Sequence, residues 1–251
     1  MSKGTFTVVG TGLRVAMHLT PEALAAIRRS DRFFYLVYDR VTERWLSMLK
    51  PGAISLRRFY KRNTQWRDCC DRMVDEMLLS VKDGFNVCAG FGGHPAVCVY
   101  PSGEAIRRAR EEGFEATMLP AVSTVDCLFA DLGVDPGNDG CRMFDVNEFL
   151  SRKPMMDPHT GLILFQVGAF RTRRALSLLR SVLAQTYPAK HSIVVYDAPL
   201  IPTWKAVIRR VPLSSLASCR LSFVSTLYIP ASKRARVNRR MAERLAWSRT
   251  E

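Results

Sequence analysis

The sequence of 251 residues lacks any apolar run near the roughly 18 residues that a membrane-spanning helix needs. Its N-terminal stretch, MSKGTFTVVGTGL, also lacks the apolar segment of a secretory signal peptide. We therefore expect a cytoplasmic protein with no membrane partner. Acidic residues are few as well: 23 Asp and Glu against 37 Lys and Arg give a net charge of +14.

The cysteines lack the spacing of a metal site or a redox pair. There are seven, an odd number, and no two of them form a C-x-x-C motif. We expect free thiols in a reducing compartment and no bound metal.

Familiar nucleotide-binding and hydrolase motifs are incomplete. The segment VVGTGL, residues 8–13, places Gly10 and Gly12 after an apolar run, but Val15 stands where a dinucleotide fingerprint needs a third glycine. No Walker lysine pattern occurs, and Ser123 lies in no G-x-S-x-G elbow. The first loop is therefore interpreted as one that approaches a ligand closely.

The excess positive charge has two open interpretations. Much of it lies in SKRARVNRRMAERLAWSRTE, residues 232–251, which could form a solvated terminal helix. Alternatively it forms an electropositive surface that attracts an acidic peptide or a nucleic acid. Because no zinc finger, RNA-binding aromatic motif or helix-turn-helix pattern accompanies the charge, we do not expect nucleic acid.

Apolar runs alternate with segments of helical period along the chain. TFTVVG precedes TPEALAAIRRSD, where Thr20 can cap a helix, and RFFYLVY precedes RVTERWLSMLK. This alternation predicts an α/β fold with a mainly parallel sheet in residues 1–120. In residues 121–251 the runs HSIVVYDAP, KAVIRRVPL and LSFVSTLYIP follow closely, which predicts a second α/β domain with a mixed sheet.

One loop stands out within the first domain. The run FNVCAG leads into Gly92, Gly93, His94 and Pro95, and SGEAIRRA then has a helical pattern. Exposed amides at the carboxyl end of a strand are where α/β sheets bind ligands. From the residues alone, a cofactor loop and a structural turn are equally open.

The segment GHPAVCVYPSGEAIRRAREEGFEATMLPAVSTVDCLFADLGVDPG, together with VVGTGL, FQV, YDAP and STLYIP, resembles the tetrapyrrole (corrin/porphyrin) methylase superfamily. Within it, the sequence is most similar to the borosin peptide backbone α-N-methyltransferases. The run DCLFADLGVDP, residues 126–136, is the most specific part. The resemblance implies a two-domain fold that holds S-adenosyl-L-methionine in a cleft between the domains and releases S-adenosyl-L-homocysteine.

The resemblance also implies a set of cofactor-binding residues. They lie in the GHP loop, after MLP, and in FQV, YDAP and STLYIP: Gly93, His94, Pro95, Val97, Ser123, Thr124, Gln166, Ala198, Thr226 and Leu227. Each is at a predicted strand end or on a neighbouring loop, which agrees with the interpretation from the residues.

A backbone amide is a poor nucleophile, so its methylation needs stabilisation of imidate charge or help with proton loss. In borosin enzymes the resemblance assigns this to an arginine and tyrosines. Tyr60 matches one of these tyrosines and Arg67 lies one position after the place of the arginine, so both are candidate catalytic residues. Three positions depart from the family pattern: Trp66 stands in place of the arginine, Cys70 in place of a tyrosine, and Gly92 in place of an aromatic residue.

The resemblance favours an N-methyltransferase of the split borosin type. Its substrate would be a separate precursor peptide, supplied in trans with an acidic leader that suits the positive charge, and the enzyme would be a homodimer. The three departures leave two alternatives open: a catalytically degenerate paralogue that binds peptide or an active partner, and a tetrapyrrole or other small-molecule methyltransferase.

Overall fold

The computed structural model describes residues 4–61, 64–152, 155–170, 172–234 and 238–244. Contacts divide the chain into two compact units. The first comprises the chain up to Leu132 together with Ala198–Ala206, and the second comprises Gly133–Asp197 and the chain from Val207 onward. The division at residue 120 that the sequence suggests stays a prediction.

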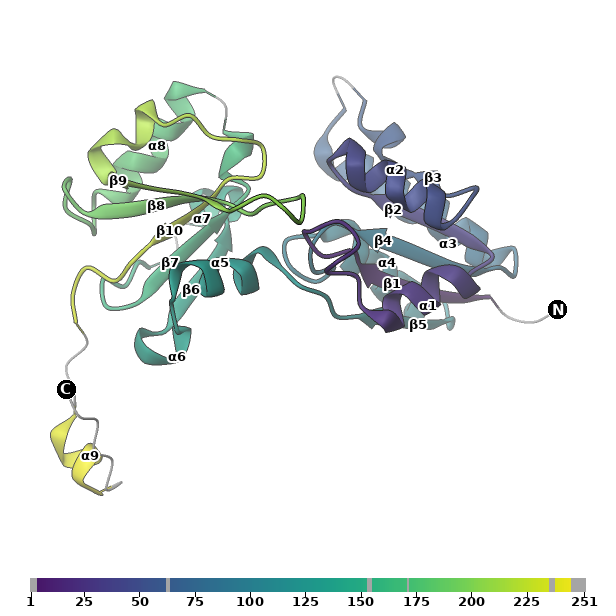
Figure 1. Cartoon of the computed structure of the whole chain (residues 1–251), viewed down its shortest axis with the longest axis horizontal. Coiled ribbons are helices and arrows are strands. Elements are labelled where there is room, and N and C mark those ends of the chain that lie inside the picture. Colours follow the sequence, from purple (N-terminus) through teal and green to yellow (C-terminus); the bar gives the residue numbers. More distant parts are fainter. Residues whose placement is uncertain (1–3, 62–63, 153–154, 171, 235–237, 245–251) are drawn as a thin grey trace. The chain divides into compact units, whose positions relative to one another are not determined.

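The first unit holds a five-stranded sheet with helices on both faces (Figure 1). Its elements in chain order are β1 (Thr5–Gly10), α1 (Pro21–Arg29), β2 (Arg32–Leu36), α2 (Arg40–Leu49), β3 (Ile54–Ser55), the 3-10 helix η1 (Leu56–Phe59), α3 (Trp66–Lys82), β4 (Asn86–Phe91), α4 (Tyr100–Glu111), β5 (Glu115–Leu119) and α5 (Thr124–Leu132). The strands are all parallel in the order β3-β2-β4-β1-β5, so their carboxyl ends meet at one edge.

Strand alternation explains why both faces of this sheet are covered. Phe34 and Leu36 pack on the face that α3 and α4 cover, whereas Phe33 and Tyr35 pack on the face of α1 and α2. A strand buried on both sides is typical of parallel sheets. The mainly parallel first sheet expected from the sequence is confirmed.

The second unit holds a mixed sheet in the order β6-β7-β10-β8-β9. Its elements are α6 (Pro136–Asp139), β6 (Cys141–Asp145), α7 (Val146–Arg152), β7 (Gly161–Phe165), the 3-10 helix η2 (Val167–Ala169), α8 (Arg173–Leu183), β8 (Ser192–Asp197), β9 (Val207–Pro212), the 3-10 helix η3 (Leu213–Ser218), β10 (Thr226–Ile229) and α9 (Arg239–Arg244). Only the β6–β7 pair is parallel, and the remaining pairs in the ladder are antiparallel. The mixed second sheet is therefore also confirmed.

The basic C-terminal segment is described only in part. Helix α9 covers Arg239–Arg244, while residues 235–237 and 245–251 of the predicted terminal helix lie outside the described residues. Within the described part of the chain, no helix combines the length and apolar character that crossing a bilayer requires. All seven cysteines are free thiols.

Candidate functional site

The loop after β4 is joined to the loop after β1 at the carboxyl edge of the first sheet. Gly93 donates its N–H to the carbonyl of Gly12 at 2.9 Å, and Gly12 donates to the carbonyl of Gly93 at 3.2 Å. Both residues have positive φ, +74° and +67°, which favours glycine at these positions. Backbone hydrogen bonds therefore join the two glycine loops.

Gly10 allows a third segment of the chain to approach these two loops closely. A Cβ on Gly10 would lie 2.3 Å from the carbonyl oxygen of Gly93 and 2.4 Å from the Cβ of Ala121, which follows β5. Only a residue without a side chain permits such an approach. Gly10 was not among the predicted site residues, although a glycine that ends the first strand was the available signal.

The interior of the GHP loop is held by its own hydrogen bonds. Nδ1 of His94 accepts the N–H of Ala96 at 3.1 Å, and the His94 carbonyl accepts the N–H of Val97 at 3.1 Å. The fully buried Ser102, at the start of α4, donates its hydroxyl to the carbonyl of Pro95. His94 thus shapes the loop through one ring nitrogen.

Ser123 and Asp126 together cap α5. The Ser123 hydroxyl accepts the N–H of Val125 at 3.1 Å, and the Asp126 carboxylate accepts the Ser123 N–H at 2.6 Å and its hydroxyl at 2.8 Å. This reciprocal arrangement is a capping box, which satisfies N–H groups that the first turn leaves unpaired. Thr124 is the first residue of α5.

The predicted residues of the second unit meet at one edge of its sheet. Gln166 follows β7 directly, in the left-handed region at φ 60°, and Thr226 and Leu227 open the antiparallel neighbour β10. Strand β8 ends beside them because Thr226 pairs with Tyr196. There the Asp197 carboxylate accepts the hydroxyls of Ser225 at 2.5 Å and of Ser222 at 2.9 Å.

Ala198, which follows Asp197, is grouped with the first unit. It begins the loop Ala198–Ala206, whose Leu200 carbonyl accepts the N–H of Val15 at 3.1 Å. The loop is thereby bound to the segment that follows Gly12.

Tyr60 and Arg67 lie close in sequence but have different partners. Tyr60 follows η1 and lies near Tyr38 and Trp66, both of which influence the pKa of its hydroxyl. The guanidinium carbon of Arg67 lies 4.1 Å from the ring centroid of Tyr100, a cation–π distance. Arg67 forms this contact rather than an ion pair with Asp71, whose carboxylate accepts the Tyr100 hydroxyl at 3.1 Å.

Burial controls the ionisation of this group. It raises the pKa of the Tyr60 hydroxyl, and the neighbouring Tyr38 and Cys70 raise it further. Burial also raises the pKa of the Cys70 thiol to about 12, with Cys69 and Asp71 adding to the effect. Cys70 is therefore a protonated, packed thiol at neutral pH, and its chemistry is not that of a nucleophile.

The predicted candidates left out three aromatic neighbours of this group: Tyr38, Trp66 and Tyr100. Trp66 had a signal, because the resemblance places the arginine of the family at this position. Tyr38 and Tyr100 had none, because β2 and α4 bring them in only after folding.

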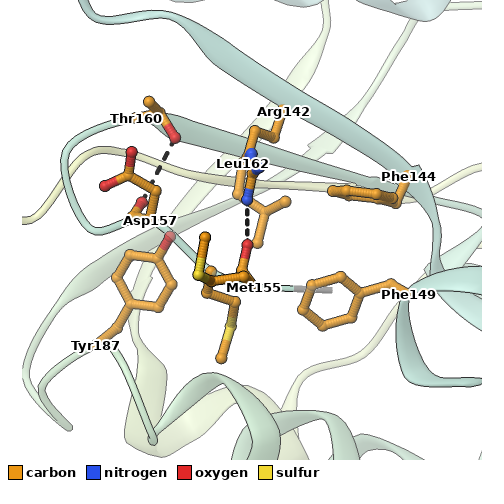
Figure 2. Close-up of a pocket in the computed structure, with 9 residues that line it drawn as sticks. Arg142, Phe144, Phe149, Met155, Asp157, Thr160, Leu162 and Tyr187 are labelled. Atoms are coloured by element: carbon orange, nitrogen blue, oxygen red, sulfur yellow. Dashed lines mark hydrogen bonds between the residues drawn. The ribbon is translucent and has the colours of Figure 1, made fainter. Parts of the chain in front are cut away.

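Two hollows in the surface have none of the predicted site residues in their lining. A groove of about 320 Å³ on the first unit is lined by Phe59, Arg72, Asp75, Glu76, Leu78, Leu79, Lys82 and Arg108. The pocket of Figure 2, in the second unit, has a volume of about 10 Å³, and there Arg142 donates to the Met155 carbonyl and Thr160 donates to the Asp157 carbonyl. The latter has room for at most one water molecule.

A family model settles the classification of this arrangement. Residues 5–209 match the model described as tetrapyrrole (corrin/porphyrin) methylases. The chain belongs to the tetrapyrrole methylases.

Curated relatives of this methylase chain combine two functions in their names. It is 35% identical over 248 residues to the methyltransferase and ribosomally synthesized cyclic peptide dendrothelin A precursor of Dendrothele bispora, covering 94% of this chain and 60% of that protein. It is 34% identical to the corresponding omphalotin A precursor of Omphalotus olearius, covering 96% of this chain and 61% of that protein. A type III borosin precursor of Anomoporia bombycina is 33% identical, with 90% of this chain and 28% of that protein covered. The chain thus spans about 60% of the first two relatives.

Solved structures agree on the fold. The uroporphyrin-III-C-methyltransferase of Thermus thermophilus superposes with a TM-score of 0.66 at 18% identity, covering 92% of this chain and 93% of that chain. A second structure of that enzyme, complexed with S-adenyl homocysteine, gives 0.65 at 17% identity, covering 91% and 98%. The predicted superfamily and the two-domain methylase fold are confirmed, as is the similarity to borosin enzymes.

Proposed function

We propose that this tetrapyrrole methylase is an S-adenosylmethionine-dependent methyltransferase that methylates backbone amides of a ribosomal peptide. The observation that carries the proposal is the similarity, over at least 90% of this chain, to proteins named as methyltransferases and cyclic peptide precursors. The family alone would equally suit a tetrapyrrole acceptor, and the relatives' names support the peptide acceptor.

The residues at both sheet edges fit the cofactor. Backbone amides, hydroxyls and small side chains suit the neutral adenine and ribose, and a Cβ on Gly92 would meet only the Leu36 carbonyl oxygen, at 3.9 Å, so this side of the loop is uncovered. The residues that would hold the cofactor are Gly93, His94, Pro95, Val97, Ser123, Thr124, Gln166, Ala198, Thr226 and Leu227. When bound, S-adenosyl-L-methionine supplies an electrophilic methyl group, and S-adenosyl-L-homocysteine is the product.

Tyr60 and Arg67 are the proposed acceptor-side residues. Arg67 is a permanent cation with several N–H donors, which suits charge developing on a peptide carbonyl oxygen. Tyr60, kept neutral by its surroundings, can hydrogen-bond the amide that loses its proton. Their task is to orient the amide and stabilise its charge.

We further propose that the peptide is supplied in trans, with an acidic leader that the net charge of +14 attracts. The resemblance to borosin enzymes supports a homodimer, and the absence of nucleic-acid motifs supports a peptide rather than a nucleic-acid partner. We propose the cytoplasm as its compartment.

The test compares two peptides, one added separately and one fused to the chain, each with S-adenosylmethionine. Tandem mass spectrometry should show methyl groups on backbone nitrogens of the separate peptide. Methylation confined to the fused peptide would contradict trans action, and methylation of an added tetrapyrrole alone would contradict the peptide substrate.

One observation favours a second function. Trp66 occupies the position where the resemblance places an arginine, and Arg67 lies against Tyr100. A degenerate paralogue would bind peptide or an active partner without turnover. Calorimetry should then detect peptide binding, while no methylated product forms even with the cofactor bound.

A further inference from the structure

Helices α3 and α4 pack side by side on one face of the first sheet (Figure 1). Tyr100 is the first residue of α4, and its ring contacts Trp66 and Arg67, the first two residues of α3. Two residues later, the fully buried Ser102 donates its hydroxyl to the Pro95 carbonyl of the GHP loop. Tyr100 therefore connects the helix that follows the GHP loop with the helix that carries Arg67.

The Tyr100 hydroxyl binds the carboxylate that could pair with Arg67. Asp71 follows Arg67 by four residues on α3, a spacing at which opposite charges on a helix form ion pairs. The Asp71 carboxylate instead accepts the Tyr100 hydroxyl at 3.1 Å. The guanidinium carbon of Arg67 lies over the same tyrosine, 4.1 Å from the ring centroid. One side chain thus contacts both members of the ion pair that does not form.

A second carboxylate, on α4, is also bound by another group. Glu104 lies one turn after Tyr100, and Arg107 donates from Nη2 and Nε to its two oxygens at 2.6 Å and 2.9 Å. Among the described residues, none forms an ion pair or a hydrogen bond with the Arg67 guanidinium. Its charge is therefore not neutralised by a neighbour, and its N–H donors are available to a ligand.

We propose that Tyr100 is a positioning residue that keeps Arg67 available to the carbonyl oxygen of the acceptor amide. Its ring holds the guanidinium through a cation–π contact, and its hydroxyl occupies the carboxylate of Asp71. A guanidinium paired with Asp71 would have to leave that carboxylate before it could stabilise charge on the substrate. This inference rests on the proposed function for the role of Arg67.

The kinetic test uses the full chain with the peptide that it methylates. Tyr100→Phe keeps the ring but releases Asp71 to pair with Arg67, so kcat should fall about threefold to fivefold while KM for the peptide stays within about twofold. Adding Asp71→Asn removes the competing carboxylate and should restore most of kcat. A residue with only a structural role would give the opposite result, because a second lost contact would lower kcat further.

The matched control is Asp75→Asn in the same Tyr100→Phe background. Asp75 lies one turn beyond Asp71 on α3, and its carboxylate is bound by Arg108 at 2.6 Å. Removing this charge should not restore kcat. Equal recovery with Asp75→Asn and Asp71→Asn would mean that the general loss of negative charge, rather than the release of Arg67, explains the rescue, and it would contradict the inference.

The contact between Tyr100 and Arg67 can be tested without substrate by NMR. An aromatic ring at 4.1 Å from a guanidinium shifts the signals of the adjacent δ protons upfield. Arg67→Lys identifies these signals by removing them. Tyr100→Leu should abolish the upfield shift, whereas the double variant of Tyr100→Phe and Asp71→Asn should keep it.

The failure of this inference can be distinguished from the failure of the proposed function. In an active enzyme, a double variant that is no faster than Tyr100→Phe overturns the positioning role, as do δ-proton signals that do not respond to Tyr100→Leu. A wild-type chain that methylates no peptide overturns the proposed function, and the catalytic reason for keeping Arg67 unpaired is then lost with it.

Discussion

Gly10 and Gly92 differ in what a single methyl group would meet. At Gly10 an added Cβ lies 2.3 Å from a backbone oxygen, which cannot move aside, whereas at Gly92 the only neighbour is 3.9 Å away. We expect Gly10→Ala to lower the free energy of unfolding by about 1–3 kcal/mol. Gly92→Ala should leave it unchanged or raise it by about 0.4–1 kcal/mol. Urea denaturation of both variants checks this, and equal losses would contradict it.

His18 gives the fold a pH dependence. Its Nδ1 accepts the N–H groups of Leu13 and Arg14, both at 3.3 Å, which requires that nitrogen to be unprotonated. Burial lowers the pKa of His18 and the Arg14 charge lowers it further, against a smaller opposite effect of Asp126. The unfolded chain therefore takes up the proton first as the pH falls below about 6.5.

The direction in which stability changes with pH follows from this difference in proton uptake. The contribution of neutral His18 to stability is complete above about pH 6.5 and declines as the pH falls toward and below the lowered pKa. Denaturation at pH 7.5 and pH 5 should show a smaller loss of stability in His18→Gln than in the wild type. His94→Gln is the matched control, and an equal slope in His18→Gln and wild type would rule out the linkage.

At the scale of an element, a substitution in the capping box of α5 can show whether Ser123 has a structural role or binds the cofactor. We expect Ser123→Ala to lower the free energy of unfolding by about 0.5–2 kcal/mol, because two N–H groups lose their acceptor. Thr124→Ala is the neighbouring control. If stability is unchanged and S-adenosylmethionine affinity falls in calorimetry, the hydroxyl serves the cofactor instead.

Helices that combine a helical spacing of apolar residues with a capping residue could be predicted from the sequence. Helix α1 begins after Thr20, whose hydroxyl accepts the Ala23 N–H at 3.1 Å, as its pattern indicated. The run AISLRRFY, whose apolar pattern is short, forms a two-residue strand and then η1. Strand β6 was not anticipated, since its exposed edge position allows polar residues that hide a strand pattern.

The candidate site could be predicted only where glycine marks the backbone. The Gly12–Gly93 bridge lies at the loops that the sequence singled out. The aromatic neighbours of Tyr60 were beyond prediction, because Tyr38 comes from the end of another strand and Tyr100 packs against Trp66 from another helix. Tertiary pairing of this kind leaves no spacing in the sequence.

At the scale of the whole molecule, the net charge of +14 supplies a long-range attraction that no single site explains. Such attraction is screened by salt, since the Debye length falls from about 10 Å at 0.1 M to about 3 Å at 1 M. The affinity for a peptide held mainly by apolar contacts would change little with salt concentration. Salt dependence therefore separates recognition of an acidic leader from recognition of an apolar core peptide.

We expect the affinity for a peptide with an acidic leader to fall about tenfold or more between 0.05 M and 0.5 M salt, because the attraction between opposite charges is screened. Fluorescence anisotropy with a labelled peptide measures this directly. The matched control replaces each Asp and Glu of the leader by Asn and Gln, which should bind weakly at every salt concentration. Equal salt responses of the two peptides would mean that the charge serves another partner, and duplex DNA in the same assay, with a steep loss of affinity as salt rises, would identify nucleic acid as that partner.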